Sequence, residues 1–454
     1  MGCMSDAYRI ERDTMGEMRV PAEALYGAQT ARALENFPVS GLRFQRAFIR
    51  ALALVKSAAA RVNGAHGHIP ADLAARIEAA AEKVAEGLYD DQFVVDIFQT
   101  GSGTSTNMNA NEVIARLAGA HPNDHVNRCQ SSNDAIPTAI HVAAAVEVHE
   151  RLFPAMEALQ ASLTRKAAGF MDVIKIGRTH LQDAVPMRLG QEFSGYARQV
   201  EASRERVTAS LPGIYELPLG GTAVGTGLNA PAGFAAAVIA EIARRTGLPF
   251  VEAPNHFEAQ AARDAAAFLS GALRTYAVAL TKIANDIRWL GSGPRCGIGE
   301  IQLPAVQPGS SIMPGKVNPV IAESVLMVAA QVVGHDAAIA WCAAAGNFEL
   351  NVMMPLMAYD LLDAVALLTA ASSNFASKLV DGLEADAARA AGFVEQSLAM
   401  GTALAPEIGY ERATALVKEA YRTGRTVREV AREQSGIPEE RLRELLDPAR
   451  QAGG

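Results

Sequence analysis

The sequence predicts a mainly α-helical protein, and three observations support this fold class. Long windows contain no proline and are rich in Ala, Leu, Met, Glu and Arg, which are strong helix formers. Apolar residues in these windows recur three and four positions apart, as on one face of a helix. Aromatic residues make up only 6% of the chain, and alternating β-branched runs are scarce. The windows lie between Pro186 and Pro212, Pro254 and Pro294, Pro319 and Pro355, and Pro355 and Pro406.

The windows after Pro254 and Pro319 predict the two clearest helices. The apolar face of the first comprises Phe268, Leu269, Leu273, Tyr276, Ala277, Leu280, Ile283, Ala284, Ile287 and Leu290. The second has few polar residues between its apolar ones, which include Val325, Met327, Val328, Val332, Val333, Ala337 and Ile339. We expect that second helix to be buried on most sides. Because a helix of 30 residues spans about 45 Å, we expect the long helices to pack against helices of other subunits.

Changes in composition along the chain predict three domains, which suits a length of 454 residues. Residues 1–130 are expected to form a mixed, mainly helical N-terminal domain. Residues 131–355 should form the central bundle of long helices, and residues 356–454 a small C-terminal helical domain with a charged tail.

Charge and cysteine content exclude several classes of function. The net charge of −8 provides no basic surface for nucleic acid or for anionic lipid. No uncharged apolar stretch reaches about 18 residues, so no membrane span is expected, and the charged N-terminus lacks the apolar core of a signal peptide. The widely spaced Cys3, Cys129, Cys296 and Cys342 do not form a disulfide framework. We therefore expect a cytoplasmic protein with no nucleic-acid or membrane partner.

Polar, Gly-rich segments interrupt the apolar chain and carry the candidate chemistry. None fits the dinucleotide or P-loop patterns, and no cluster of side chains has the spacing of a metal site, so we expect no cofactor and no metal. The segments supply hydroxyls, amides, backbone N–H groups, and the side chains of Lys and His. Because several lead into helix N-termini, they are suited to bind an anion and to move a proton. They lie at residues 99–107, 121–124 with 130–134, 177–183, 221–227 and 309–319.

The segment 309–319 is interpreted as a mobile lid. Two glycines flank Ser310 and Ser311, and Lys316 lies at the hinge. Asn318 and the proline after it should begin a helix near Val320. The alternative is a surface turn, which would not predict a helix start directly behind it.

His180 is the candidate acid or base of the segment 177–183. A lone His is more often structural than catalytic, but here its neighbours Arg178 and Asp183 are of the kind found at anion sites. Glu323 lies on the apolar helix after the lid, where a buried and unpaired carboxylate would cost several kcal/mol. We therefore expect Glu323 to have a partner such as His180.

Together these segments closely resemble those of class II fumarate hydratases, in the fumarase/aspartase superfamily. The similarity extends from about Tyr8 to about Pro448. The resemblance implies three mainly helical domains with a central five-helix bundle, and a homotetramer whose bundles form a twenty-helix core. It also implies active sites shared by three subunits and reversible hydration of fumarate to L-malate without a cofactor.

The resemblance further implies roles for individual residues. Ser310 looks like the base that removes the C3 proton of malate, His180 like the residue that handles the hydroxyl or water, and Glu323 like its partner. The residues that match substrate contacts are Ser102, Gly103, Thr104, Ser131, Ser132, Asn133, Thr179, Ser311, Lys316, Val317 and Asn318. Those that match a second dicarboxylate site are His121, Pro122, Asn123 and Asp124. Family members carry a basic residue shortly before that site, and here Arg116 is the nearest.

Two alternatives remain within the same superfamily. Aspartate ammonia-lyases usually have Gln where this chain has His180 and Ala where it has Gly315, so both positions favour the hydratase. A catalytically silent structural relative is the other alternative. The presence of Ser310, His180, Lys316 and Glu323 argues against it.

Overall fold

The computed structural model describes residues 7–453, which form two compact units. Each unit is assembled from three separate stretches of chain. Unit 1 comprises Met1–Pro154, Glu205–Ala277 and Ala330–Thr369, and unit 2 comprises Ala155–Arg204, Val278–Ala329 and Ala370–Gly454. Every boundary between the units falls inside a long helix, so five helices contribute to both units. The predicted division at residues 130/131 and 355/356 stays a prediction.

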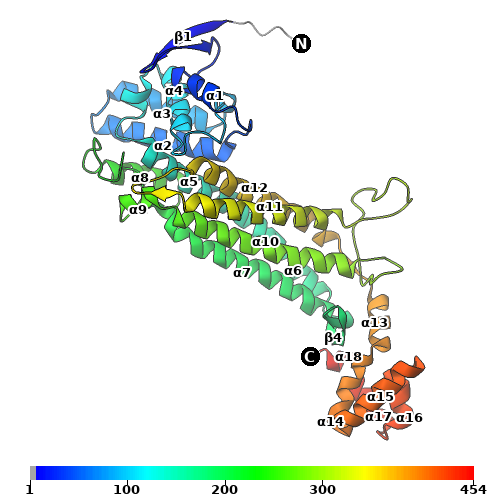
Figure 1. The fold of residues 1–454 in the computed structure, drawn as a ribbon. Helices are drawn as coiled ribbons and strands as arrows, with labels where there is room; N and C mark the ends of the chain where they lie inside the picture. The colour runs from blue at the N-terminus through cyan, green and yellow to red at the C-terminus, as the bar shows by residue number, and fades with distance from the viewer. Residues whose placement is uncertain (1–6, 454) are drawn as a thin grey trace. The chain divides into compact units, whose positions relative to one another are not determined.

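Helices dominate the described chain, which confirms the predicted fold class (Figure 1). The helices that precede the long ones are α1 (Ala28–Asn36), α2 (Arg46–Ala65), α3 (Ala71–Ala85), α4 (Thr104–Ala118) and α5 (Ser132–Glu147). The five long helices shared by the units are α6 (Phe153–Gly169), α7 (Leu189–Tyr215), α10 (Asp264–Leu290), α11 (Val320–Ala343) and α12 (Met354–Lys378). The shorter ones are α8 (Phe234–Thr246), α9 (His256–Ala261), α13 (Ala387–Gln396), α14 (Ala405–Ile408), α15 (Tyr410–Thr423), α16 (Val427–Gln434), α17 (Glu439–Leu445) and α18 (Pro448–Gln451).

Short segments of other helix types connect these elements. The π-helical turn η3 (Val148–Leu152) joins α5 directly to α6. A second π-helical turn, η2 (Pro122–Val126), follows α4. The remaining segments are the 3-10 helices η1 (Asp90–Gln92), η4 (Val380–Gly382) and η5 (Leu398–Leu404).

The strands of the described chain pair only two at a time. The antiparallel pairs are β1 (Tyr8–Asp13) with β2 (Gly16–Pro21), β3 (Ile174–Thr179) with β4 (Gln182–Arg188), β7 (Ile301–Gln302) with β10 (Glu384–Ala385), and β8 (Gly346–Asn347) with β9 (Leu350–Asn351). The pair β5 (Glu216–Leu217) with β6 (Val251–Glu252) is parallel. The polar segment 177–183 thus lies in a β-hairpin, which the sequence did not predict.

The predicted helix faces are confirmed for α10 with one exception. Leu269, Leu273, Ile283 and their partners on the predicted stripe are buried, whereas Phe268 is 60% exposed. In unit 1, Arg274 of α10 pairs with Asp336 of α11 at 2.9 Å. Ser270 of α10 also donates its hydroxyl to Asp336 at 2.7 Å, so two polar contacts join these neighbouring helices.

Helix α11 differs from its prediction. Together with Met354–Gly382, it is long and apolar enough to cross a membrane by length and composition alone. Buried core helices pass the same test, and the second segment is mostly buried. On α11, however, Met327 is 68% and Trp341 77% exposed. The prediction that this helix is buried on most sides is therefore wrong for the single chain. An apolar helix surface indicates that the surface is buried, but it does not indicate which element or molecule covers it.

The C-terminal helices enclose a separate core within unit 2. It includes Val394, Leu404, Leu416, Val430 and Leu446. The three cysteines of the described residues, Cys129, Cys296 and Cys342, are free, and Cys3 lies outside the described residues. The charged N-terminal segment used to exclude a signal peptide also begins outside them.

A buried histidine links α11 to α12 in unit 1 and predicts a pH-dependent stability. His335 pairs through Nδ1 with Asp360 at 2.8 Å and through Nε2 with Asp363 at 2.9 Å. Burial lowers the pKa of His335, but the two carboxylates outweigh it and raise the pKa to about 9. Its stabilisation, up to about 3 kcal/mol, is complete below the unfolded pKa of about 6.5 and is lost as pH rises through 9.

We expect the stability difference between the wild-type chain and His335→Gln to be largest near pH 6. The difference should shrink towards pH 10, because neutral imidazole no longer forms an ion pair. Thermal or denaturant unfolding across this pH range measures it. A difference that stays constant with pH would mean that the histidine is not charged in the folded state.

Candidate active site

Hydroxyl groups from two helix N-termini meet in unit 1. Gly103 precedes α4 with a φ of 75°, in the left-handed region that favours glycine. Ser102 Oγ and Thr104 Oγ1 share a hydrogen bond of 2.8 Å, and Thr104 Oγ1 shares another, of 2.7 Å, with Ser132 Oγ on α5. The predicted contact residues of segments 99–107 and 130–134 are thus brought together.

The N-terminus of α5 is capped and held by its own side chains. Ser131 forms a capping box with Asp134, whose Oδ1 accepts from Ser131 N at 2.9 Å. The buried Oδ2 of Asp134 accepts from the backbone N–H groups of Gly220 and Thr222 at 3.0 and 2.9 Å. The cap is therefore tied to the segment 221–227, which sequence reasoning had left without a role.

A cavity of about 600 Å³ lies beside this N-terminus in unit 1. Ser131 forms part of its wall, as do Asn123, Asp124, Arg128 and Ala223. The positive end of the α5 dipole and the hydroxyl groups at its N-terminus favour an anion at such a place. Asn123 and Asp124, which were predicted for the second dicarboxylate site, thus border the same cavity as Ser131, which was predicted to contact the substrate.

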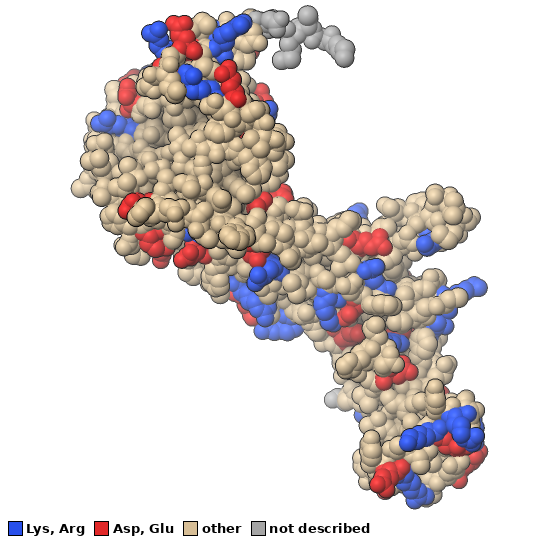
Figure 2. All heavy atoms as spheres, viewed as in Figure 1, with Lys and Arg blue, Asp and Glu red and all other residues tan. Residues whose placement is uncertain are grey.

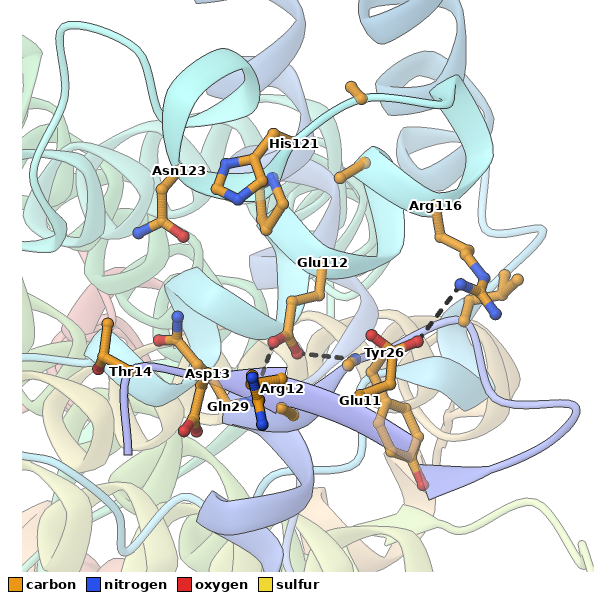
Figure 3. Close-up of a pocket in the computed structure, with 16 residues that line it drawn as sticks. Glu11, Arg12, Asp13, Thr14, Tyr26, Gln29, Glu112, Arg116, His121 and Asn123 are labelled. Atoms are coloured by element: carbon orange, nitrogen blue, oxygen red, sulfur yellow. Dashed lines mark hydrogen bonds and ion pairs between the residues drawn. The ribbon is translucent and has the colours of Figure 1, made fainter. Parts of the chain in front are cut away.

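The other residues of the predicted second site border a separate cavity of about 570 Å³ in unit 1. Figure 3 shows His121 and Asn123 on the turn after α4, with Arg116 on α4 itself. His121 Nδ1 accepts from the backbone N–H of Asp124 at 3.1 Å. Arg116 pairs with Glu11 at 3.3 Å, so the basic residue nearest to this site is engaged with a carboxylate on β1.

His180 lies at the tip of the hairpin β3–β4 in unit 2, and Thr179 is the residue before it. Thr179 pairs with Gln182, so His180 and Leu181 form a two-residue turn. Both have a positive φ, 57° and 60°, which such a tight hairpin turn requires but which disfavours residues other than Gly or Asn. His180 is exposed, and Leu181 is 64% exposed. Strained, exposed residues of this kind cluster at functional sites.

The base of that hairpin is anchored by buried charges. Arg178 forms two hydrogen bonds of 3.0 Å with Glu300, whose side chain is fully buried. Lys175, also buried, lies 3.4 Å from Glu300 and 3.0 Å from Glu192. Two cations and two carboxylates thus balance within unit 2, and they hold the strand that ends at Thr179.

The segment 309–319 is a loop closed by its own backbone. Gly309 donates its N–H to Lys316 O at 2.8 Å, and its carbonyl accepts from Asn318 Nδ2 at 2.6 Å. A Cβ at Gly309 would lie 2.5 Å from Lys316 O, so no other residue fits there. Within the loop, Ser310 Oγ accepts from the N–H groups of Ile312 and Met313 at 3.2 and 3.1 Å. Helix α11 begins at Val320, which confirms the predicted start.

Lys316 and Glu323 border one cavity of about 450 Å³ in unit 2, with Val317, Asn318 and Arg288. Arg288 donates to Asn285 at 2.9 Å, but its buried Nε has no partner. No hydrogen bond or ion pair within residues 7–453 joins Glu323 to His180. Their expected pairing stays a prediction.

The predicted site residues are therefore divided between the two units. Those of segments 99–107, 121–124 and 130–134 belong to unit 1, and those of segments 177–183 and 309–319, with Glu323, belong to unit 2. On the face shown in Figure 2, Lys and Arg side chains are interspersed with Asp and Glu, so no large surface of one sign is visible there. Among residues 7–453, no three or more His, Cys, Asp and Glu side chains form a group that could hold a metal ion.

Comparison with known proteins identifies the family. The sequence family described as Lyase matches residues 16–334, and the one described as Fumarase C C-terminus matches residues 401–450. The class II fumarate hydratase of Mycobacterium tuberculosis is 55% identical over 97% of this chain and 94% of its own length. That of Xylella fastidiosa is 51% identical over 98% and 95%. This chain belongs to the class II fumarate hydratase family.

The fold agrees with that of a fumarate hydratase. The crystal structure of a class II fumarase from Schistosoma mansoni is 40% identical and superposes with a TM-score of 0.96, covering 98% of this chain and 99% of that one. The predicted resemblance is thus confirmed over nearly the whole chain.

Sequence reasoning about this fumarate hydratase missed two residues that border the sites. One is Arg288, which borders the cavity of Lys316 and Glu323. The other is Lys56, a fully buried lysine on α2 that contacts Asn127 and Gln130 in the wall of the cavity beside α5. A signal for Lys56 was present, because it interrupts the apolar run from Ala51 to Ala60. Such a lysine usually extends its charge to water, and only the structure shows that this one does not.

Proposed function

We propose that Ser310 and His180 carry out the two proton transfers of the family's reaction and that the segments around them bind its dicarboxylate. As a member of the class II fumarate hydratase family, the chain catalyses the hydration of fumarate to L-malate. The observation that carries the assignment of roles is the loop 309–319, in which two backbone N–H groups point at Ser310 Oγ.

Ser310 is the base in the direction from malate to fumarate. A serine hydroxyl is a poor base unless its alkoxide is stabilised, and hydrogen bonds to the charged form favour that form. The N–H groups of Ile312 and Met313 supply two such bonds. Ser310 Oγ takes the C3 proton, and the electron pair of the C–H bond moves into the adjacent carboxylate to give a dianionic aci-carboxylate. Lys316 and Asn318 are placed on the same loop to stabilise that charge.

His180 acts on the hydroxyl. As the electrons return to form the double bond, the C2–O bond breaks and His180 protonates the departing hydroxide to give water. In the hydration direction the same imidazole takes a proton from the attacking water. Glu323 is the partner that orients this imidazole or balances its charge.

The remaining polar residues bind the two carboxylates of the substrate. Hydroxyls and backbone N–H groups at the N-termini of α4 and α5 suit one carboxylate, because the helix dipole adds to their hydrogen bonds. The proposed contacts are Ser102, Gly103, Thr104, Ser131, Ser132 and Asn133, together with Thr179, Ser311, Lys316, Val317 and Asn318 from the segments 177–183 and 309–319. The turn His121, Pro122, Asn123 and Asp124 is the second dicarboxylate site.

The working form is a homotetramer in which three subunits share each active site. The exposed apolar side chains of α11, such as Met327 and Trp341, support this proposal, because a long apolar face on a helix needs a partner. Central bundles of five helices would then form a twenty-helix core. In such a core, α11 would be buried by other subunits rather than by lipid. The proposed enzyme is cytoplasmic and has no membrane or nucleic-acid partner.

An absorbance assay of the purified chain with fumarate tests the reaction. We expect malate to form at a rate that a chelator does not change, because no metal or cofactor takes part. Concentrated ammonium should yield no aspartate. Aspartate forming faster than malate would assign the chain to the ammonia-lyases, and no turnover at all would make it a silent structural relative. Loss of activity on chelation, restored by iron, would contradict the metal-free mechanism.

A further inference from the structure

Lys56 is a buried lysine that lies behind the proposed carboxylate site, and none of the chemistry above uses it. It is fully buried on α2, where its Nζ donates to Asn127 Oδ1 and to Gln130 Oε1, each at 3.0 Å. Both acceptors are neutral amides. A buried ammonium without a carboxylate in contact costs free energy, so burial alone does not explain why the position holds a lysine.

Asn127 connects Lys56 to helix α4. Its Oδ1 also accepts from the side-chain amides of Asn107 and Asn111 on α4, each at 3.2 Å. Its Nδ2 donates to Gln130 O at 3.1 Å. One amide oxygen therefore receives three donors, of which Lys56 is the charged one, and this fixes the side chain of Asn127 in a single orientation.

Gln130 connects Lys56 to the turn that leads into α5. Its Nε2 donates to the carbonyls of Val126 and Arg128, each at 3.1 Å. Cys129 in this turn has a φ of 62°, an unfavourable backbone conformation that its surroundings must maintain. The next residue after Gln130 is Ser131, the N-cap of α5. Lys56 thus braces the turn that places Ser131, Ser132 and Asn133.

The charge of Lys56 also lies behind the anion site. Burial lowers the pKa of Lys56 to about 7, and the buried carboxylate of Asp134 on α5 opposes that lowering. Asp134 in turn accepts three backbone N–H groups at the cap and at residues 220 and 222. An anion bound at the N-terminus of α5 would favour the protonated form of Lys56, as Asp134 does.

We propose that Lys56 is a positioning residue for dicarboxylate binding: it braces Asn127 and Gln130 so that the N-terminus of α5 is held in its binding geometry, and its buried positive charge favours an anion there. This inference rests on the proposed assignment of Ser131–Asn133 to a substrate carboxylate. It predicts that removing the charge of Lys56 weakens the binding of a dicarboxylate without lowering the stability of the folded chain.

Lys56→Met tests the proposal, because methionine fills similar space without the charge. We expect the KM for fumarate, and the Kd for succinate measured by calorimetry, to rise about tenfold. The kcat should fall less than about threefold, since Lys56 touches no reacting atom. The unfolding midpoint should not fall, because replacing a buried charge by an apolar side chain is often neutral or stabilising. Lys83→Met makes the same change at an exposed position of α3 and should leave all three quantities unchanged.

Gln130→Glu is the second variant and keeps the shape of the network. It places a carboxylate where Oε1 now accepts from Lys56 Nζ, so the ion pair should preserve folding. The added negative charge should raise the Kd for succinate at least as much as Lys56→Met does. If Lys56→Met does not fold, this variant decides, and an unchanged Kd overturns the proposal.

Ser132→Ala separates this proposal from the one it rests on. If Ser132→Ala leaves the Kd for succinate unchanged, the carboxylate site itself is wrongly assigned. If Ser132→Ala weakens binding but Lys56→Met and Gln130→Glu do not, only the role of Lys56 is overturned. Weaker binding in Lys56→Met together with a lower midpoint and lost assembly would assign Lys56 to the fold and would also overturn it.

Discussion

Replacing Ser310 by alanine is expected to lower kcat by a factor on the order of 10²–10⁴, the usual cost of losing a general base. The variant loses the only atom proposed to take the C3 proton, and it also leaves the N–H groups of Ile312 and Met313 without their acceptor. KM should change less, because the lost interaction acts mainly in the transition state. Steady-state kinetics with fumarate and with malate measure both quantities.

Two neighbouring variants make this expectation specific. Ser311→Ala removes the adjacent hydroxyl, which is proposed to contact substrate, and should raise KM more than it lowers kcat. Ser310→Thr keeps a hydroxyl that can accept the same two N–H groups and should recover part of kcat. Exchange of the C3 hydrogen of malate with deuterated solvent should disappear in Ser310→Ala. Persistence of that exchange would mean that another group is the base.

His180→Asn is expected to lower kcat on a similar scale, by about 10²–10⁴. Asn is smaller than His and keeps a polar side chain, but its amide cannot protonate the departing hydroxide. It also tolerates a φ of 57° better than His does, so backbone strain should fall and the unfolding midpoint should not decrease. Turnover per folded molecule, with circular dichroism and the oligomeric state as controls, measures the effect.

Leu181→Asn is the matched control for this variant. It relieves the same kind of strain at the next residue, where φ is 60°, and should stabilise the chain by about 1 kcal/mol, the scale of the left-handed backbone penalty. Its kcat should stay within about threefold of the wild-type value. A His180→Asn variant that unfolds, while the remaining folded molecules turn over normally, would make His180 a structural residue.

The parts of the fold that depend on local pattern could be predicted from the sequence. The stripe from Leu269 to Leu290 gave α10, and Asn318 with Pro319 placed the start of α11, because periodicity and capping are properties of neighbouring residues. Phe268 departs from its stripe, because periodicity cannot distinguish the edge of a face from its centre. For α11 the composition indicated burial, but the single chain leaves Met327 and Trp341 exposed, because composition does not specify what a helix face packs against.

The segments that carry the candidate site could be predicted from the sequence. The local structure of these segments and their long-range contacts could not. The hairpin at His180 was missed because its turn residues, His and Leu, carry none of the Gly or Asn signals of a tight turn. Lys56 was missed because its partners Asn127 and Gln130 lie about 70 positions away in sequence. Contacts of that range follow from tertiary packing, which no local pattern encodes.

The interleaving of the two units has a consequence for synthesis on the ribosome. Unit 1 needs residues up to Thr369, and unit 2 needs residues up to the C-terminus, so neither core can close early. At about 5–20 residues per second, tens of seconds pass between synthesis of the first helices, which can pack against one another, and synthesis of the last stretch of unit 1. When α11 emerges, the apolar side chains that the single chain leaves exposed, such as Met327 and Trp341, remain uncovered. We therefore expect this chain to depend on holdase chaperones during translation, and truncation anywhere before residue 369 to yield aggregates rather than a folded fragment.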